Sequence, residues 1–464
     1  MAILTSIFLT VLAACKAQAA ALQIIPGAAW TATNTGQHIQ AHGAGIIEAN
    51  GIYYMIGEDK TNGALFQNVN CYSSSNLVDW KYEGALLSRT DADVQKVASL
   101  ADPNSLVERP KVVFNERTKK YVMYFHLDIK YEIAEVGIAT SDTVCGKYTF
   151  HSSFRPGGRQ IRDIGLFKDD DGSAYLLAEN RQFGTNEEVR SITYIMSLDS
   201  EYLNVTGIVH TFENHAAESP AMLKKDGYYF IFSSTLSGWD PNDNYYSYAP
   251  SLAGPWSSWK LFADEGSLTY RSQTTYILPF GDSAIYMGDR WQEHSLGSST
   301  YIWLPLEFKG TEVSMPYRDV WSLDPISKTW SGSKTTVLEP QDAKLSNGAR
   351  LVGCDGCSSR SAAGYLGGPE RGAVTFSGGL SKCCKKATIV LVYVNGDLTS
   401  RFALVTVNGK KQKVEFPPSF NDQQISNVVI YGNFHSGSDN TIVVEGDDGG
   451  WAPNIDKIIL ACAV

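Results

Sequence analysis

The chain has 464 residues, among them 41 Gly, 24 Tyr and 10 Trp, and its formal net charge is −10. Nucleic acids and anionic membranes are bound through basic surfaces, so this acidic balance argues against both as partners. Many Tyr and Gly residues with little sustained helical periodicity favour an all-β protein, and a secreted enzyme acting on a neutral polymer fits the charge.

The first 20 residues have the form of a secretory signal peptide. An apolar stretch runs from Ile3 to Cys15, and Ala17-Gln18-Ala19 has the small-x-small form of a cleavage site. The basic residue usual at the amino end is missing, and the alternative is a buried N-terminal strand. No later segment has the ~18 apolar residues that a membrane span requires. We therefore expect a secreted, extracellular protein without a membrane partner.

Four polar residues then recur at intervals of 55 positions: Glu108, Asp163, Glu218 and Gln273. The segments that they open read ERPKVVFNERTKKYVMYF, DIGLFKDDDGSAYLLAE, ESPAMLKKDGYYFIFSS and QTTYILPFGDSAIYMGD, and an earlier copy, HGAGIIEANGIYYMIGE, starts at His42. Four of the five segments contain a Gly paired with Asn or Asp between apolar runs, at Asn50-Gly51, Asp171-Gly172, Asp226-Gly227 and Gly281-Asp282. Such pairs predict β-hairpins.

The second half of each unit reads as two further strands with a Ser-rich connection, as in CYSSSNLVDW and YYSYAPSLAGPW. Four strands per unit and five units predict a five-bladed β-propeller over residues 21–330. The first strand of each blade lines the axis of a propeller. We therefore expect the 55-spaced residues to converge at one mouth of the axial channel.

The converging acids suggest hydrolysis of a sugar acetal, in which one carboxyl group protonates the leaving oxygen and a second group acts on water. A third carboxylate would raise the pKa of the acid by like-charge repulsion. Trp239 and Trp291 lie near strand ends and suit the faces of sugar rings. The alternative is that the polar register only bonds neighbouring blades, but burying several like charges together is costly without a use for them.

Two of these segments resemble glycoside hydrolase family 43. The residues that carry the resemblance are Arg162-Asp163-Ile164-Gly165-Leu166-Phe167, followed by Asp169-Asp170-Asp171-Gly172, and Glu218-Ser219-Pro220-Ala221-Met222. The similarity covers about residues 35–310 and implies a five-bladed propeller that works by inversion. It further implies that Glu218 is the general acid and that Asp163 orients it and tunes its pKa.

The first unit departs from the family pattern, in which an Asp of blade one is the general base. Gly43 stands at that place, in the segment Gln40-Ala41-His42-Gly43-Ala44-Gly45. This departure resembles the exo-β-1,3-galactanase subgroup, which implies that Glu108 binds substrate or assists and that Gln273 handles water, either as an imidic acid tautomer or by positioning water beside a carboxylate. Further candidates for contacts with sugar are His42, Gly43, Glu58, Tyr124, Asn180, Thr235, Trp239, Arg290 and Trp291.

Residues 331–464 read as a second all-β domain, a β-sandwich (jelly-roll), after a linker rich in Ser, Thr, Lys and Pro. The segments Leu338-Glu339-Pro340-Gln341-Asp342-Ala343 and Asn454-Ile455-Asp456-Lys457-Ile458 resemble a family-35 carbohydrate-binding module. That resemblance implies a structural Ca²⁺ held by Glu339, Gln341 and Asp456, and a sugar site at Tyr365, Asp448 and Trp451. The alternative is that Trp451 belongs to the core and Glu339 is a surface acid.

The chain has eight cysteines, at positions 15, 71, 145, 354, 357, 383, 384 and 462. Cys354-x-x-Cys357 with Cys383-Cys384 could form a zinc site. In a secreted chain we expect disulfides instead, and the sequence leaves their pairing open.

These features favour an exo-acting hydrolase that releases galactose with inversion from the β-1,3-galactan backbone of type II arabinogalactans. We expect a monomer that needs no catalytic cofactor. Two alternatives stay open: another family-43 specificity, α-arabinofuranosidase or β-xylosidase, against which Gly43 argues, and a galactan-binding lectin without catalysis.

Overall fold

A computed structural model of the protein describes residues 22–183, 189–213, 217–333, 335–377, 386–419, 425–435 and 440–461. The expected signal peptide lies outside these residues, as do Cys15, Cys383, Cys384 and Cys462. Strands dominate the described part, and its helical segments are single turns: η1 (Val94–Lys96), α1 (Ala98–Ala101), η2 (Pro156–Gly158), α2 (Leu268–Arg271), η3 (Glu293–Ser298) and η4 (Pro340–Asp342). No described helix is long and apolar enough to cross a membrane.

Twenty of the described strands form five four-stranded antiparallel sheets, each made of consecutive strands. The first three sheets are β3 (His42–Ala49), β4 (Ile52–Glu58), β5 (Asn68–Ser74), β6 (Lys81–Ser88); β7 (Ser105–Asn115), β8 (Lys120–Ile129), β9 (Glu135–Ser141), β10 (Thr149–Phe154); and β11 (Ile164–Lys168), β12 (Ala174–Phe183), β13 (Val189–Leu198), β14 (Val205–Phe212). The other two are β15 (Ala217–Lys225), β16 (Tyr228–Thr235), β17 (Tyr245–Ala249), β18 (Lys260–Leu261); and β19 (Gln273–Phe280), β20 (Ser283–Arg290), β21 (Thr300–Lys309), β22 (Glu312–Ser314).

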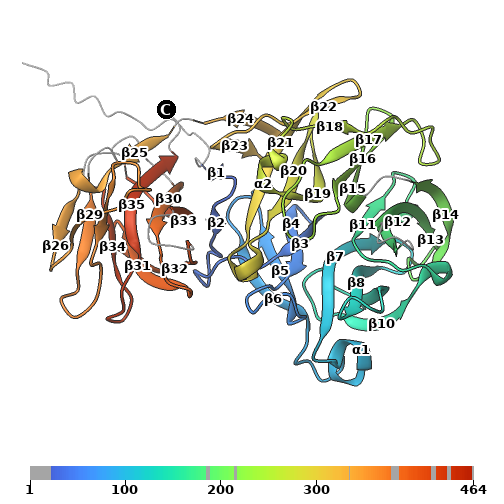
Figure 1. Ribbon diagram of the computed structural model, residues 1–464, viewed down its shortest axis with the longest axis horizontal. Coiled ribbons are helices and arrows are strands. Elements are labelled where there is room, and N and C mark those ends of the chain that lie inside the picture. Colours follow the sequence, from blue (N-terminus) through green and yellow to red (C-terminus); the bar gives the residue numbers. More distant parts are fainter. Residues whose placement is uncertain are drawn as a thin grey trace, which may run out of the picture.

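The first strands of the five sheets form a closed ring. β3 contacts β7, β7 contacts β11, β11 contacts β15, β15 contacts β19, and β19 contacts β3 again. This arrangement is that of a five-bladed propeller, with the sheets set around a common axis (Figure 1). Two of the expected hairpin turns, Asn50-Gly51 and Asp226-Gly227, have positive φ at both positions, as a type I′ turn requires.

Apolar side chains pack between neighbouring sheets rather than along the axis. Ile56 and Leu87 of the first sheet share a cluster with Met123 of the second, and Ile138 of the second shares one with Leu176 of the third. Neighbouring sheets pack against each other through these faces because each sheet buries apolar residues on both sides. The polar starts of the inner strands are thereby left to face the axis.

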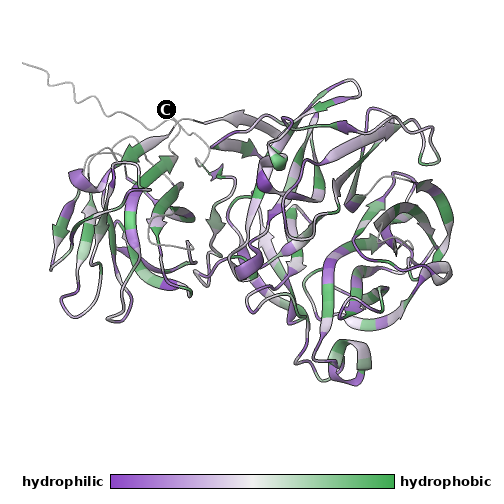
Figure 2. Ribbon diagram, in the orientation of Figure 1, coloured by the Kyte–Doolittle hydropathy of each residue, from purple (hydrophilic) through white to green (hydrophobic). Residues whose placement is uncertain are grey.

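The C-terminal region contains a seven-stranded and a five-stranded sheet, which lie beside the five sheets (Figure 1). Figure 2 shows apolar residues concentrated along its central strands. The larger sheet contains β2 (Ala29–Trp30), β33 (Ser426–Asn433), β30 (Lys386–Val394), β35 (Asn454–Ala461), β28 (Ser361–Gly364), β27 (Arg350–Gly353) and β25 (Thr336–Leu338). The smaller contains β26 (Lys344–Ser346), β29 (Ala373–Phe376), β34 (Ile442–Gly446), β31 (Arg401–Val407) and β32 (Lys410–Phe416). Both sheets contribute to one core, in which Ile389 and Ile458 accompany Val405 and Val444.

The N-terminal segment joins the two regions. β1 (Gln23–Ile24) pairs with β23 (Trp321–Asp324), which continues to β24 (Thr329–Gly332), whereas β2 runs parallel to β33 of the C-terminal region. Trp30 of β2 also packs edge-on against Trp303 of the fifth sheet, at 4.9 Å between ring centroids. Residues before 31 therefore contribute to both regions.

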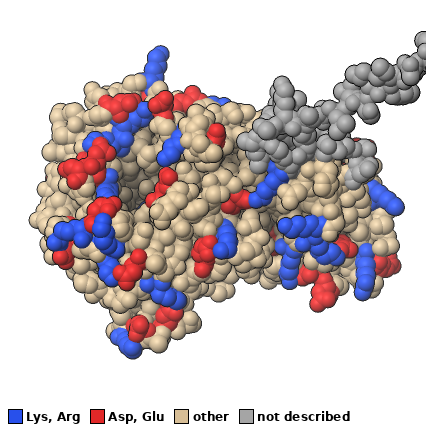
Figure 3. Space-filling model, turned by 180° about the vertical axis from the view of Figure 1, so that it is seen from behind, with Lys and Arg blue, Asp and Glu red and all other residues tan. Residues whose placement is uncertain are grey.

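Four of the described cysteines form two disulfides. Cys71 of β5 bonds to Cys145 after β9, so this bridge joins the first two sheets, and Cys354 bonds to Cys357. The expectation of disulfides is confirmed for these four residues, and Cys354 and Cys357 are not thiolate ligands of a metal. On the face shown in Figure 3, acidic and basic side chains are interspersed.

Candidate active site

A cavity of about 390 Å³ opens where the five inner strands begin. Its walls are formed by Glu58, Glu108, Arg109, Tyr131, Arg162, Asp163, Arg181, Glu218, Gly238, Trp239, Gln273 and Trp291. All four of the 55-spaced residues lie in this wall. The repeat in the sequence therefore brings three acids and an amide together at one end of the axis.

A β-bulge directs these side chains into the cavity. The pairing of β7 with β8 shifts after Glu108, and the pairing of β15 with β16 shifts after Glu218. The next residue has a left-handed backbone in both cases, with φ of 51° at Arg109 and 59° at Ser219. A bulge inserts one residue and bends the strand, which re-aims the side chain beside it. Gly43, at φ 56°, has the same conformation in β3.

Glu218 is buried and bonded on both carboxylate oxygens. Its Oε1 accepts a hydrogen bond from Gln273 Nε2 at 2.8 Å, and its Oε2 lies 2.5 Å from Arg181 Nη2. Burial and the negative charge of Asp163 raise the pKa of Glu218 to about 8, against the opposing charge of Arg181. A carboxyl group with this pKa is protonated at neutral pH and can act as a general acid.

Gln273 is held at both ends of its amide. The oxygen Oε1 accepts from Arg109 Nη2 at 2.6 Å and from Trp291 Nε1 at 2.9 Å, and the amide nitrogen also donates to Ser234 Oγ at 3.2 Å. Guanidinium and indole groups can only donate hydrogen bonds. The contacts of Oε1 therefore favour the amide over an imidic acid, whose O–H would face two donors.

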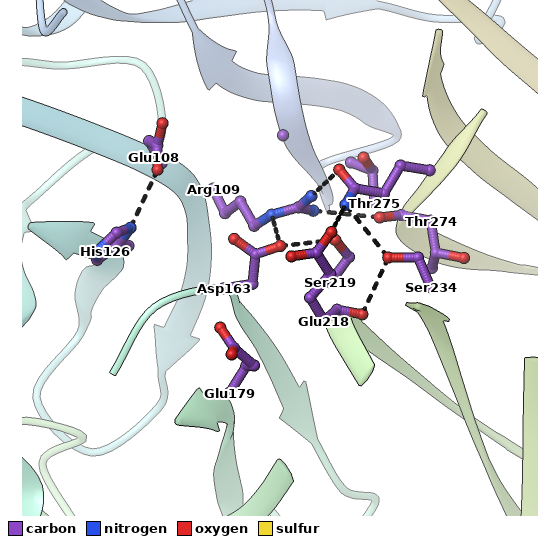
Figure 4. Close-up of polar contacts among 12 residues, drawn as sticks. Glu108, Arg109, His126, Asp163, Glu179, Glu218, Ser219, Ser234, Thr274 and Thr275 are labelled. Carbon is purple, nitrogen blue, oxygen red and sulfur yellow. Dashed lines mark hydrogen bonds and ion pairs between the residues drawn. The ribbon is translucent and has the colours of Figure 1, made fainter. Parts of the chain in front are cut away.

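Asp163 lies between Glu218 and Arg109 (Figure 4). Its Oδ2 is 2.9 Å from Arg109 Nε and accepts from Ser219 Oγ at 2.7 Å. Burial raises the pKa of Asp163, but the charge of Arg109 and the Ser219 hydrogen bond outweigh it and lower the pKa overall. Asp163 is therefore a carboxylate that keeps negative charge beside the Glu218 carboxyl.

Glu108 lies away from this group, on the wall formed by the second sheet, with His126 behind it (Figure 4). Tyr131 donates to Oε1 at 3.2 Å, and Lys60 Nζ lies 3.5 Å from the same oxygen. Burial raises the pKa of Glu108, but Lys60 and His126 hold it well below its usual range. Glu108 is thus an ionised acceptor for hydrogen bonds.

Trp239 and Trp291 form an aromatic corner of the cavity, as expected from the sequence. Their ring centroids are 4.9 Å apart and the planes meet at 74°. Lys60 Nζ lies 5.8 Å from the ring centroid of Trp239. Half-buried indole rings beside acids provide the apolar face and polar rim that bind a sugar ring.

Comparison with known proteins agrees with this site. A model of glycosyl hydrolases family 43 matches residues 39–264. The chain is similar to an exo-β-1,3-galactanase variant from Phanerochaete chrysosporium whose crystal structure contains β-1,3-galactotriose. The two sequences are 39% identical, the alignment covers 95% of this chain and 100% of the other, and the TM-score is 0.65. The chain belongs to glycosyl hydrolase family 43.

Other family-43 proteins are similar over different lengths. An exo-β-1,3-galactanase from Clostridium thermocellum is 26% identical over 93% of this chain and 99% of its own, with a TM-score of 0.61. A curated xylosidase/arabinosidase from Thermoclostridium stercorarium is 28% identical over 213 residues, 40% of this chain. The chain spans 43% of the length of that curated relative.

Several residues expected to contact sugar do not line the cavity of this family-43 chain. Tyr124 of the second sheet donates to the carbonyl of Tyr202 in the third sheet region, and Arg290 donates to the carbonyl of Tyr270. These side chains lie away from the cavity because strand neighbours alternate between two faces. Asn180 bonds Tyr194 at 3.4 Å, and Thr235 bonds Asn242 through its backbone.

His42 and Gly43 lie next to the cavity without lining it. His42 is buried, and its Nδ1 lies 3.1 Å from Asp289 Oδ1, while the Gly43 amide donates to Asp289 Oδ2 at 2.8 Å. His42 pairs with Glu58 across β3 and β4 just as Glu108 pairs with His126 across β7 and β8. In the register of the repeat, His42 is therefore the counterpart of Glu108.

Sequence reasoning missed the cationic part of the wall. Arg109 pairs with Asp163 and Arg181 with Glu218, whereas Arg162 pairs with Asp128. Gly238 and Tyr131 complete the cavity. Arg109 and Arg162 are adjacent in sequence to Glu108 and Asp163, and that adjacency is the signal that could have found them. Arg181 and Tyr131 carry no such signal, because their approach depends on strand pairing and on the loop after β8.

In the C-terminal region, Tyr365 and Trp451 are exposed, with ring centroids 6.1 Å apart and planes at 84°. Asp448 is exposed and precedes Trp451 closely in the sequence. Arg350 covers one face of Tyr365, at 3.3 Å from the ring centroid. Trp451 is therefore a surface residue and not part of the core, and the three expected residues lie on one surface loop system.

The residues expected to hold Ca²⁺ meet around two serines. Ser358 Oγ donates to Glu339 Oε2 at 3.3 Å and to Asp456 Oδ1 at 2.9 Å, and Ser359 Oγ donates to Gln341 Oε1 at 3.3 Å. Asp456 Oδ2 is buried without a hydrogen bond, 3.9 Å from Lys457 Nζ. A buried carboxylate oxygen that accepts no hydrogen bond fits a cation ligand. No group of three or more His, Cys, Asp or Glu side chains in the described residues is arranged to hold a metal.

Proposed function

We propose that this chain is an exo-β-1,3-galactanase that releases galactose with inversion. The observation that carries the proposal is the convergence of Glu108, Asp163, Glu218 and Gln273 in one cavity, with two tryptophans on its wall. The resemblance to the Phanerochaete chrysosporium enzyme, which spans 95% of this chain, supports the same substrate class.

In the proposed mechanism, Glu218 gives its proton to the glycosidic oxygen as the bond to the anomeric carbon breaks. Asp163 keeps this proton on Glu218 until then, because a nearby negative charge disfavours ionisation. Arg181 then stabilises the glutamate that forms. The reaction uses side chains of this chain and needs no cofactor.

Gln273, held as an amide, positions the attacking water. The oxygen of this water bonds to the anomeric carbon, and its surplus proton passes to bulk water. The transition state of glycoside hydrolysis is oxocarbenium-like, so the sugar carries most of the charge and water needs little activation when it attacks. Arg109 and Trp291 fix the amide in one orientation. Glu108 accepts hydrogen bonds from sugar hydroxyls at the other wall. The absence of a blade-one carboxylate at Gly43 favours this specificity over α-arabinofuranosidase or β-xylosidase activity.

The C-terminal sheets form, in this proposal, a β-sandwich (jelly-roll) carbohydrate-binding module over residues 331–464. Trp451 and Tyr365 present faces for galactan, and Asp448 binds hydroxyls. Ca²⁺ would be held by Glu339, Gln341 and Asp456 and would neutralise the buried carboxylate. We further propose that the protein is secreted after cleavage of residues 1–20 and acts as a monomer.

The general acid is tested by replacing Glu218 with Gln, which keeps the shape and removes the acidic proton. We expect kcat on β-1,3-galactotriose to fall by roughly 10²–10⁴-fold, the range general acid catalysis contributes. The circular dichroism spectrum should be unchanged, which serves as the control for folding. Retention of more than about a tenth of the activity would contradict the role of Glu218.

Chromogenic galactoside, arabinofuranoside and xyloside substrates separate the alternatives. Turnover of the arabinofuranoside or xyloside in preference to the galactoside would favour the other family-43 specificities. Binding of galactan without any turnover would favour a lectin.

A further inference from the structure

Glu108 belongs to a line of alternating charges along one wall of the cavity. Glu58 Oε2 lies 2.6 Å from Lys60 Nζ, which lies 3.5 Å from Glu108 Oε1. The line continues through His126 to Asp128 and ends at Arg162, 3.5 Å from Asp128 Oδ2. Acidic and basic side chains alternate along this line.

His126 lies between two carboxylates, one at each ring nitrogen. Its Nδ1 is 3.1 Å from Glu108 Oε2, and its Nε2 is 3.0 Å from Asp128 Oδ2. A neutral imidazole has one N–H and one lone pair, so one of its nitrogens would direct a lone pair at a carboxylate oxygen. With both carboxyl groups ionised, both contacts are hydrogen bonds only when the ring carries a proton on each nitrogen.

The other contacts of Asp128 favour its carboxylate form over a form that carries the proton. Asp128 Oδ1 accepts the backbone N–H of Ile129 and of Ile133, each at 2.8 Å. Arg162 adds a positive charge at Oδ2, and Asp128 is completely buried. These donors stabilise the carboxylate form, which in turn stabilises the imidazolium.

We propose that His126 is a positioning residue, held doubly protonated between Asp128 and Glu108, which keeps Glu108 ionised and fixed as the acceptor for a galactose hydroxyl. This inference rests on the proposed function for the identity of the sugar. His126 does not touch the cavity itself; it acts through Glu108, together with Lys60 and Tyr131 on the other oxygen.

Electrostatics of the buried site agree with this geometry. Burial lowers the pKa of His126, but hydrogen bonds to Asp128 and Glu108 and their charges raise it to about 9. Because this pKa lies above the ordinary value of 6.5, the stabilisation is complete below about pH 6.5 and is lost as the pH rises through about 9. Galactose binding should weaken over that same upper range.

The protonation state is measured directly by NMR on the full chain labelled with ¹⁵N in its histidines. The protein has eight histidines, and the His126→Gln variant assigns the signals of His126. We expect both ring nitrogens of His126 to have shifts of protonated nitrogens at pH 7.5. A shift of an unprotonated nitrogen at that pH would overturn the proposal. This readout requires no turnover, so it is independent of whether the protein hydrolyses galactan.

The consequence for binding is measured by titrating the protein with galactose between pH 6 and 10. The Asp128→Asn substitution removes one of the two carboxylates that stabilise the His126 imidazolium. We therefore expect galactose binding to be roughly tenfold weaker at pH 8 and little changed at pH 6. Asp142→Asn is the matched control, because Asp142 belongs to the same sheet region and pairs with an exposed Lys120. Equal pH profiles for Asp128→Asn and the control would contradict the role of His126. Absence of galactose binding at every pH would instead count against the proposed function.

Discussion

At the scale of single residues, the site depends on keeping two neighbouring carboxyl groups in opposite protonation states. Arg109 and Ser219 hold Asp163 ionised, and burial beside that charge keeps the proton on Glu218. With one carboxyl group protonated and the other ionised, a single active site has both a proton donor and a negative charge at the same pH.

Replacing Asp163 with Asn tests this coupling. The general acid works only when protonated, so activity is lost as the pH rises through the pKa of Glu218, about 8 in the intact protein. Asparagine removes the charge that raises this pKa, and we expect the alkaline limb of kcat/KM to move to lower pH. The pH dependence of kcat/KM on β-1,3-galactotriose measures the shift, and an unmoved alkaline limb would show that Asp163 does not tune Glu218.

At the scale of elements, the bulges at the starts of β3, β7 and β15 decide which residue enters the cavity. A Cβ atom at Gly43 would lie 2.2 Å from Glu58 Oε1 and 3.0 Å from Arg109 Cα. The φ of 56° is also unfavourable for any other residue. The absence of a side chain at Gly43 therefore makes room for Glu58 and Arg109. It also leaves this position without a carboxylate that could act as a base.

Gly43→Asp should not create a better enzyme, although it restores the carboxylate of other family members. We expect a fall of at least about tenfold in kcat/KM and a loss of about 1–3 kcal/mol in the free energy of unfolding, the usual cost of strained backbone. Gly172→Asp is the control, since Gly172 has φ 84° with no atom within 4 Å of its added Cβ. A gain in kcat/KM in Gly43→Asp would contradict the packing argument.

The loop carrying Ser358 and Ser359 gives a second prediction at this scale. If Ca²⁺ binds at Asp456, saturating calcium should raise the melting temperature and EDTA should reverse the effect. A concentration of 100 times Kd stabilises by about 2.7 kcal/mol, which corresponds to a few degrees. Differential scanning fluorimetry measures the change, with Glu339→Gln as the variant that should respond less. A melting temperature that calcium leaves unchanged would rule out the site.

The strands and their convergence could be predicted from sequence, because a repeat of 55 residues places equivalent residues at equivalent points of successive sheets. The residues that contact the acids could not be predicted in this way. Lys60, His126 and Arg181 reach the acids through strand pairing and loops, which spacing does not reveal. Tyr124, Asn180, Thr235 and Arg290 also lie near strand ends, but each makes its hydrogen bonds outside the cavity. Closeness to a strand end was therefore too weak a criterion.

At the scale of the whole molecule, the two regions share apolar packing. Val390, Val392 and Val429 of the C-terminal region belong to the same core as Trp303 and Trp321. Tyr431 also donates to the carbonyl of Val78 in the first sheet region. The N-terminal strand β1 pairs with β23, and β2 pairs with β33 of the C-terminal region. The N-terminal segment therefore links the two regions further.

This packing predicts that the chain unfolds as one unit. Separating the regions would expose the shared apolar core and break the pairing of β2 with β33, so partial unfolding should be unfavourable. Scanning calorimetry of the full chain should show a single transition, whose calorimetric and van't Hoff enthalpies agree. Two resolved transitions would mean that the regions are independent.

The central claim is exo hydrolysis of β-1,3-galactan with inversion, and the first product decides it. Purified protein is incubated with β-1,3-galactotriose labelled at its reducing end, and the products are followed by proton NMR. The account predicts that unlabelled galactose appears first and appears as the α-anomer. Release of β-galactose, release of labelled galactose first, or no release at all would contradict it.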